Sequence, residues 1–289
     1  MKTIRVTAAA LVLGCTAAAM PGSVRAQSFD QLASSITESF QDAIDLLPRD
    51  VTSIRIGAGP AVLPVYLGDD RYKIRAVPVI SFRYRDLFEI DNNELKITGL
   101  SKLVNARASV GEGRLRFGPL VSVDFGRKAK RSNDLTGLGN VGTSIELGAF
   151  LGYSVGPVRV SIRARHDVAG GHSGALAKGN LSLAIYRDKK LAVGSTLSTT
   201  WASSNYMNAY FGVDAGQSAG SGLPVYQPGS GIRDVAFGVS SNYLISEHFS
   251  VISNIRYSSL LGGAKNSPLV QQRGSANQVS FSTYVIYSF

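Results

Sequence analysis

The sequence predicts an all-β fold: a transmembrane antiparallel β-barrel of about twelve strands, preceded by a short N-terminal amphipathic helix. Three observations favour this class. Residues 279–289 alternate in character and end on an aromatic residue, the first 26 residues resemble an export signal, and no later segment has the roughly 20 consecutive apolar residues of a membrane-spanning helix. Mean hydropathy is only +0.08, as expected when lipid-facing and lumen-facing residues alternate.

Residues 1–26 have the three parts of a secretory signal peptide. Lys2 and Arg5 give a basic start, residues 6–13 and 17–20 an apolar stretch, and residues 24–26 a small-residue cleavage site. A lipoprotein site at Cys15 is the competing interpretation. Removal of residues 1–26 takes away three bases and the only cysteine, so the formal charge falls from +10 to +7. We expect an exported chain in the outer membrane of a Gram-negative cell, without disulfides.

The positive charge of the mature chain bears on its partners. Nucleic acid is not expected, because an exported chain does not meet it. Outer-membrane lipid is the expected surroundings, and anionic lipopolysaccharide or cell-wall polymer is the better match for a moderately basic surface.

Residues 27–50 predict a periplasmic amphipathic helix and linker. Ser28 can cap the helix with Gln31 three residues on, and apolar residues follow at helical spacing until Pro48. These apolar residues are Phe29, Leu32, Ile36, Phe40, Ile44 and Leu47. The polar face carries Asp30, Glu38, Asp42 and Asp45 and no base. The helix either packs on or plugs the barrel at its periplasmic end, or docks a periplasmic partner through Phe29, Leu32, Ile36, Phe40 and Ile44.

Residues 51–289 predict the outer-membrane barrel, because alternation with period two dominates them. The expected strands are 52–62, 72–84, 86–98, 102–110, 114–126, 143–154, 158–168, 176–187, 190–202, 232–244, 248–260 and 275–289. The count falls to ten if the hairpin around 99–101 is not real. Short connections alternate with long ones at 63–71, 127–142, 169–175, 203–231 and 261–274. Bacterial barrels place short turns in the periplasm and long loops outside.

The last strand predicts a signal for the barrel-assembly machinery. Phe281, Val285, Tyr287 and Phe289 lie on its apolar face, and mostly hydroxylated residues lie on the other.

Charged residues alternate with apolar ones on several strands, and this predicts a charged lumen. An arginine on the lipid side near the bilayer midplane costs about 2–4 kcal/mol, so the charged positions face inward. They are Arg75, Arg83, Arg116, Asp124, Glu146, Arg159, Arg163, Arg165 and Asp167. One interpretation is a salt-bridge network that fills and rigidifies a small barrel, and the other is an anion-preferring pore constriction.

Catalysis has one candidate region. Asp167, His172 and Ser173 lie close in sequence to His166, which is suggestive of hydrolysis. His166 and Asp167, however, are adjacent on a strand and therefore face opposite sides, and the glycine-rich segment 169–174 is an ordinary hairpin connection. His248 is far away in sequence. We expect no catalytic residue, no metal site, no cofactor and no enzymatic activity.

Several segments resemble one family of Gram-negative outer-membrane proteins, that of MltA-interacting protein (MipA) and OmpV. The matching stretches are 57–60 (GAGP), 64–68 (PVYLG), 125–127 (FGR), 146–150 (ELGAF), 170–174 (GGHSG), 206–213 (YMNAYFGV), 221–226 (SGLPVY) and 267–270 (SPLV) with Arg273. They run in family order across the whole predicted barrel, whereas the helix at 27–50 lies outside the pattern.

The resemblance implies an outer-membrane barrel without catalytic residues. For some members it implies a scaffold that brings a lytic transglycosylase together with a peptidoglycan synthase, and others are known as adhesins, as antigens or in antibiotic responses. Two of the matching stretches fall on the longest loop, at 203–231. An extracellular loop does not fit a purely periplasmic scaffold, and one explanation is that this loop folds into the lumen as a plug.

Overall fold

The computed structural model describes residues 52–101 and 113–289 of the chain. The predicted signal peptide, the predicted helix at 27–50 with its docking residues, and the strand expected at 102–110 lie outside these residues.

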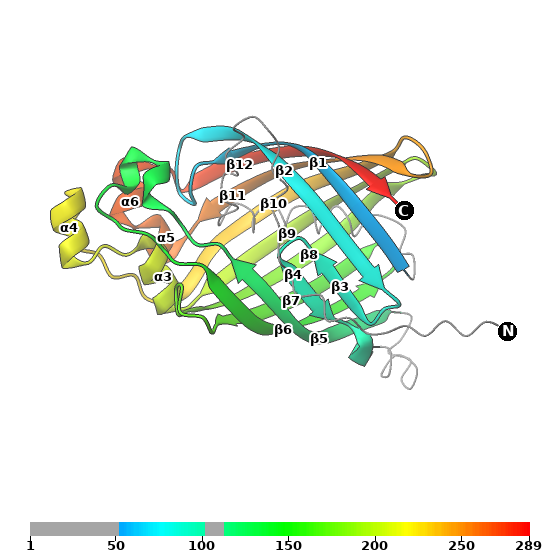
Figure 1. Ribbon diagram of the computed structural model, residues 1–289, viewed down its shortest axis with the longest axis horizontal. Helices are drawn as coiled ribbons and strands as arrows, with labels where there is room; N and C mark the ends of the chain where they lie inside the picture. Colours follow the sequence, from blue (N-terminus) through cyan, green and yellow to red (C-terminus); the bar gives the residue numbers. More distant parts are fainter. Residues whose placement is uncertain (1–51, 102–112) are drawn as a thin grey trace, which may run out of the picture.

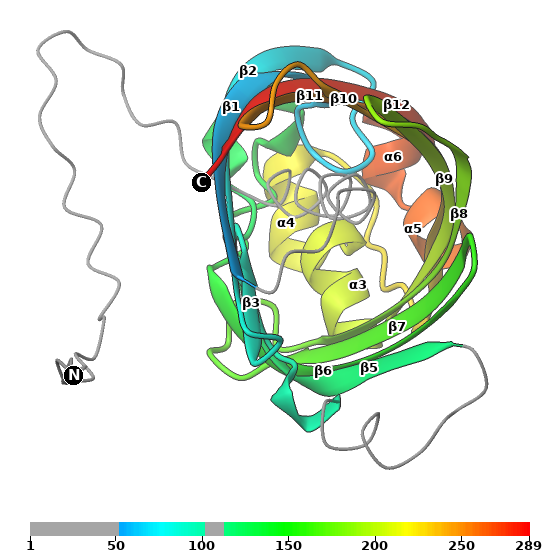
Figure 2. The ribbon, with the colours of Figure 1, turned by 90° about the vertical axis from the view of Figure 1, so that its right-hand side faces the viewer.

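The described residues form a closed antiparallel barrel of twelve strands, as predicted. The strands are β1 (Thr52–Pro64), β2 (Tyr72–Tyr84), β3 (Phe88–Asp91), β4 (Glu94–Ile97), β5 (Arg114–Asp124), β6 (Ser144–Val155), β7 (Val158–Asp167), β8 (Ala175–Arg187), β9 (Leu191–Ala202), β10 (Gly231–Leu244), β11 (Phe249–Leu260) and β12 (Asn277–Ser288). Each strand pairs with its neighbours in sequence, and β12 returns to pair with β1. Viewed along its axis the barrel is a complete ring (Figure 2).

Ten of the strands begin and end within two residues of the prediction, but the third strand was predicted wrongly. The segment expected as a single strand at 86–98 is a hairpin of β3 and β4, which turns at Asn92 and Asn93. Asn92 has a φ of +50°, in the left-handed region that asparagine tolerates better than most residues. Because β4 pairs directly with β5, the ring closes without a strand from 102–110.

Side chains alternate between lipid and lumen as the sequence predicts. In β12, Phe281 and Val285 are about half exposed on the outer surface, whereas Ser282 and Tyr284 between them are buried. In β7, Arg163 is buried inside, and Val160 and Ile162 are exposed outside. The barrel therefore has an apolar outer surface and a polar interior over most of its circumference.

Four short turns lie at one end of the barrel, and five long connections lie at the other (Figure 1). The short turns are 85–87, 156–157, 188–190 and 245–248. At the first, Arg85 and Asp86 have φ values of 47° and 56°, and the Leu87 N–H donates to the Tyr84 carbonyl at 2.8 Å, as in a type I′ hairpin turn. The C-terminus lies at this end, where the Phe289 N–H donates to the Ile54 carbonyl at 3.0 Å.

The long connections form a folded cap at the other end. We define the cap as residues 65–71, 125–143, 168–174, 203–230 and 261–276. It contains the 3₁₀ turns η1 (Ala129–Arg131) and η2 (Asn133–Leu135) and the helices α3 (Ser204–Phe211), α4 (Ala215–Ser221), α5 (Gly262–Lys265) and α6 (Pro268–Arg273). The loop expected to plug the lumen instead forms α3 and α4 at the mouth, beyond the strand ends (Figure 1). Among the residues that the structure describes, no helix combines the length and the apolar character needed to cross a membrane.

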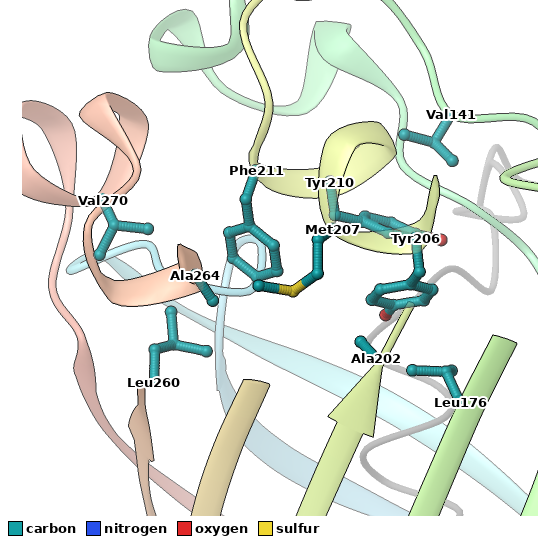
Figure 3. Packing of buried hydrophobic residues seen from close by; sticks show 10 residues of the cluster. All are labelled: Val141, Leu176, Ala202, Tyr206, Met207, Tyr210, Phe211, Leu260, Ala264 and Val270. Carbon is teal, nitrogen blue, oxygen red and sulfur yellow. The ribbon is translucent and has the colours of Figure 1, made fainter. Parts of the chain in front are cut away.

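Two apolar clusters hold the cap together. The first surrounds α3, whose Tyr206, Met207, Tyr210 and Phe211 pack against strand ends and against Ala264 and Val270 (Figure 3). The second joins Tyr66, Leu135, Val213, Leu223 and Leu269 from four connections. Glycine is required at position 174, where the chain passes the start of α3 in the first cluster, because a Cβ there would lie 2.4 Å from the Tyr206 backbone nitrogen. The cap is therefore a packed unit with a core of its own.

Candidate functional site

The candidate site is the charged wall of the lumen, built by six neighbouring strands from β2 to β7. Arg83, Arg116, Glu146, Arg163 and Arg165 all face the interior, because each occupies an inward position of its strand. Charged side chains on neighbouring strands pair with these residues and gather them into clusters.

The first centre of this wall is Glu89 on β3. It accepts from Arg83 Nε at 2.5 Å and pairs with Arg116 at 2.6 Å, and both the carboxylate and Arg83 are buried. A charge-assisted pair in this environment is strong only while both partners remain. The arrangement therefore ties β2 and β5 to the short hairpin between them.

The second centre is Glu94 on β4. Its Oε1 lies 3.0 Å from Lys96 Nζ and 3.3 Å from Arg163 Nη1, and its Oε2 lies 3.8 Å from Arg165 Nη1. Asp91 adds a contact of 3.5 Å to Lys96. One buried carboxylate thus links the hairpin to the arginines of β7.

Sequence reasoning missed Glu89, Asp91, Glu94 and Lys96 because it treated 86–98 as one strand. A signal was present: two successive asparagines sit between two short apolar–charged alternations. Reading Asn92 and Asn93 as a two-residue turn puts all four charged residues on one face, because residues 91 and 94 then pair directly.

A third centre lies where the lumen meets the cap. Glu146 Oε2 lies 2.9 Å from Arg165 Nε and accepts from Ser122 Oγ at 3.2 Å. Asp124 accepts from the Tyr210 hydroxyl at 2.9 Å, and Arg127 Nη1 donates to the Tyr210 carbonyl at 2.6 Å. Helix α3 is thereby fixed to the top of the charged wall.

Burial shifts the pKa of two groups in the cap at this centre. Burial raises the pKa of the Tyr210 phenol well above its usual value, and the Asp124 carboxylate raises it further. Burial also lowers the pKa of the Arg127 guanidinium. Tyr210 therefore remains a neutral donor over the whole physiological pH range.

Asp124, Glu146 and His172 are the residues that come nearest to a metal site among those described. Their ligand atoms lie within 4.8 Å of one another, and all three side chains are buried. The Gly174 N–H, however, donates to His172 Nδ1 at 3.0 Å, so a neutral ring carries its proton on Nε2. Nε2 lies 3.3 Å from Glu146 Oε1. The loop at 168–174 and the charged wall therefore meet at the His172 ring.

The other predicted residues have different surroundings. The Asp167 carboxylate stabilises the loop that follows it. It accepts hydrogen bonds of 2.7–3.1 Å from the backbone N–H groups of Ala169, Gly170, His172 and Ser173. Arg159 lines an interior cavity beside Arg83 and Arg116 and donates to Ser154 Oγ at 3.1 Å. Arg75 is half-buried on β2, nearer the cap than Arg83.

The histidines do not assemble with one nucleophile. His166 is on the exposed face of β7, as its alternation with Asp167 predicts. His172 is buried under Tyr206 and Tyr210, with ring centroids at 5.0 and 6.1 Å. His248 stacks on Tyr287 at the opposite end of the barrel.

The predicted assembly residues lie together on the outer face of β12. Phe281, Val285 and Phe289 are exposed, and the Tyr287 ring contacts Phe249 and Phe289 at centroid distances of 5.0 and 4.7 Å. This aromatic group lies at the short-turn end, where barrels carry an interface girdle.

An apolar outer surface, a closed ring and a charged interior define an outer-membrane β-barrel. The family model described as MltA-interacting protein MipA matches residues 56–289. The chain therefore belongs to this family, as the sequence resemblance indicated.

Comparison with solved structures finds barrels of low sequence identity. An outer membrane channel from Pseudomonas putida F1 is 10% identical, with 84% of this chain and 97% of that chain covered and a TM-score of 0.42. The NanC porin is 12% identical, with 82% and 98% covered and a TM-score of 0.38. OmpT of Vibrio cholerae is 9% identical, with 84% and 99% covered and a TM-score of 0.35. No curated protein sequence matches the chain.

Proposed function

We propose that this protein is a non-enzymatic scaffold that holds peptidoglycan-remodelling enzymes at the periplasmic face of the outer membrane. The first expected partner is a lytic transglycosylase, the second a peptidoglycan synthase. The family description names an interaction with MltA, and we propose that this chain makes the same kind of interaction.

The observation that carries the proposal is the packed cap. Apolar cores from several connections cover the outer mouth, and Tyr210 bonds it to the charged wall through Asp124. A barrel closed in this way is better suited to anchor a partner than to pass solutes. The end with the short turns remains as the face toward peptidoglycan.

The test is copurification from intact envelopes. The tagged protein, crosslinked before detergent extraction, is expected to retain a lytic transglycosylase. Two variants locate the contact: deletion of residues 27–50, which carry the predicted docking residues, and charge reversal of the exposed turn residues Lys189 and Lys190. Reversal of the cap residue Lys130, also exposed, is the matched control. Absence of any murein enzyme from the crosslinked material would refute the scaffold.

A small anion-preferring channel is the second candidate, favoured by the excess of cations facing the lumen. Eleven buried or partly buried lysines and arginines lie on the described strands, against seven buried carboxylates. The cations are Arg55, Arg75, Arg83, Lys96, Arg116, Arg159, Arg163, Arg165, Lys178, Arg233 and Arg256, and the carboxylates are Glu89, Asp91, Glu94, Asp124, Glu146, Asp167 and Asp234.

The channel is tested in planar bilayers. A conducting barrel would show anion preference, and Arg163→Glu or Arg165→Glu would shift that preference toward cations. Absence of conductance in every preparation eliminates this candidate.

A further inference from the structure

We propose that residues 27–47 of this chain occupy the barrel lumen, with their apolar side chains against an apolar lumen wall and their carboxylates toward the unbalanced cations of the lumen. The inference goes beyond the scaffold function, because it assigns an intramolecular ligand to the lumen whether or not a murein enzyme binds the periplasmic face.

The first argument is an apolar strip inside the barrel. Ala61, Leu63, Val77, Val79, Ile252, Tyr284 and Ile286 form one cluster of buried residues. They lie on β1, β2, β11 and β12, which are consecutive around the ring, while alternate residues such as Ile80 and Val285 are exposed on the outside. A water-filled pore gives no reason for such a strip. An apolar occupant does, because each Å² of apolar surface removed from water contributes about 25 cal/mol.

The second argument is charge. Subtracting the seven buried carboxylates from the eleven cations of the strands leaves an excess of four positive charges, one on β2 to β7 and one each on β1, β8 and β11. Residues 27–47 contain four carboxylates, Asp30, Glu38, Asp42 and Asp45, and no lysine or arginine. Charges in a narrow, low-dielectric lumen interact more strongly than in water, so a matching anionic segment is stabilised there.

The third argument is shape and amphipathicity. The lumen has a charged side, β2 to β7, and an apolar side centred on β1 and β12. The helical spacing of residues 27–47 likewise separates apolar from acidic residues. Complementary faces specify one orientation of the segment, with its apolar residues toward Ile252 and Tyr284.

The fourth argument is entry and length. β1 begins at Thr52 at the end with the short turns, so the preceding residues leave the strand there, opposite the cap. A helix of 21 residues is about 31 Å long. Strands of 12 residues, tilted by about 40°, span roughly 30 Å. Eleven-stranded barrels already accommodate a central helix.

The test measures the reactivity of single cysteines that face the lumen. The mature chain has no cysteine once Cys15 is removed with the predicted signal peptide. Ser250→Cys and Ser282→Cys place reporters at buried inward positions of β11 and β12, and Ser246→Cys is a control in an exposed turn. Each is labelled with a hydrophilic maleimide in the folded protein, with residues 27–47 present or deleted.

Deletion is expected to accelerate labelling at positions 250 and 282 by at least about tenfold and to leave position 246 unchanged. The double variant Asp42→Lys, Asp45→Lys is expected to produce the same change in the full chain, which covers the case in which the deletion fails to fold. Unchanged protection at both lumen positions overturns the inference, since the lumen is then closed by something other than this segment.

The two proposals fail in different ways. Absence of any murein enzyme from the crosslinked full chain, together with reporters that the deletion deprotects, refutes the scaffold alone. Loss of the enzyme on deletion with unchanged reporter protection refutes the lumen occupant alone. Deprotection of the reporters together with retained copurification confirms the lumen occupant and assigns enzyme binding to the turns.

Discussion

At the scale of single residues, Glu94 is the most connected carboxylate of the charged wall, with Lys96, Arg163 and Arg165 around it. We expect Glu94→Gln to lower the free energy of unfolding by about 3–5 kcal/mol, because it leaves buried cations without their counter-ion. The measurement is urea unfolding in detergent micelles, followed by the heat-dependent shift in electrophoretic mobility. Asp86→Asn, which breaks an exposed pair with Arg114 at 3.2 Å, should cost only about 0–1 kcal/mol. Equal losses for the two variants would contradict a wall centred on Glu94.

Asp188 allows a prediction of pH dependence in a turn outside the membrane. Hydrogen bonds from the Leu191 and Lys190 N–H groups, and from the Tyr186 hydroxyl, hold the pKa of Asp188 below its usual value. A depressed pKa contributes stability above the unfolded value, near 3.9, and this contribution is lost as the pH falls through the folded value. Asp188→Asn should therefore lower the midpoint of thermal unfolding slightly at pH 7. The difference from the parent protein should shrink below about pH 4, and a constant difference would assign it to another cause.

The arginines of the charged wall could be predicted from the sequence, and their partners could not. Arg163 and Arg165 follow directly from period-two alternation, since placing them toward lipid is costly. Glu89 and Glu94 depend on where the chain turns, and a one-residue error in a strand moves side chains to the opposite face. The contact of Tyr210 with Asp124 joins positions 86 residues apart, and no local pattern predicts it.

At the scale of elements, the cap is held to the barrel by helix α3. Tyr210→Phe removes the donor to Asp124 and leaves a buried carboxylate oxygen unsatisfied, which should destabilise the cap by about 1–3 kcal/mol. Limited proteolysis of the folded protein in detergent is the measurement, with faster cleavage expected within 203–230. Tyr226→Phe, which removes a partly buried bond to the Gly263 carbonyl, is the matched control and should have a smaller effect. Identical cleavage of both variants would argue against this anchor.

The strand β12 carries the proposed assembly signal on its outer face. Deletion of Phe289 should reduce the amount of folded, heat-modifiable protein in the outer membrane several-fold and leave synthesis unchanged. The comparison variant is Ser288→Ala, which changes the adjacent position and retains the terminal aromatic residue. An undiminished folded fraction after the deletion would remove Phe289 from the signal.

Strands were predictable at this scale, and the helices of the cap were not. Alternation and the contrast between short and long connections identified ten strands within two residues. Helices α3 to α6 have only four to eight residues each, too few to be stable alone, so their conformation depends on the apolar clusters around them. The sequence showed the long loops but not their mutual packing.

At the scale of the whole molecule, two separate obstacles to conduction follow from the structure and the proposed occupant. We expect the full chain to be silent in planar bilayers. Replacing residues 204–226 by a short glycine–serine linker should leave it silent, because the lumen segment remains. Combining that replacement with deletion of 27–47 should give conductance with anion preference, owing to the excess of lumen cations. Full conductance after the cap replacement alone would contradict an occupied lumen.

The pairing of β1 with β12 also has a consequence for biogenesis. Arg55 and Ile56 at the start of the barrel lie opposite Ser288 and Tyr287 at its end. The ring therefore cannot be completed without the last dozen residues. Every shorter chain presents two unpaired strand edges, which are prone to aggregate. Closure of the cylinder must accordingly await the final strand, whatever the state of the strands before it.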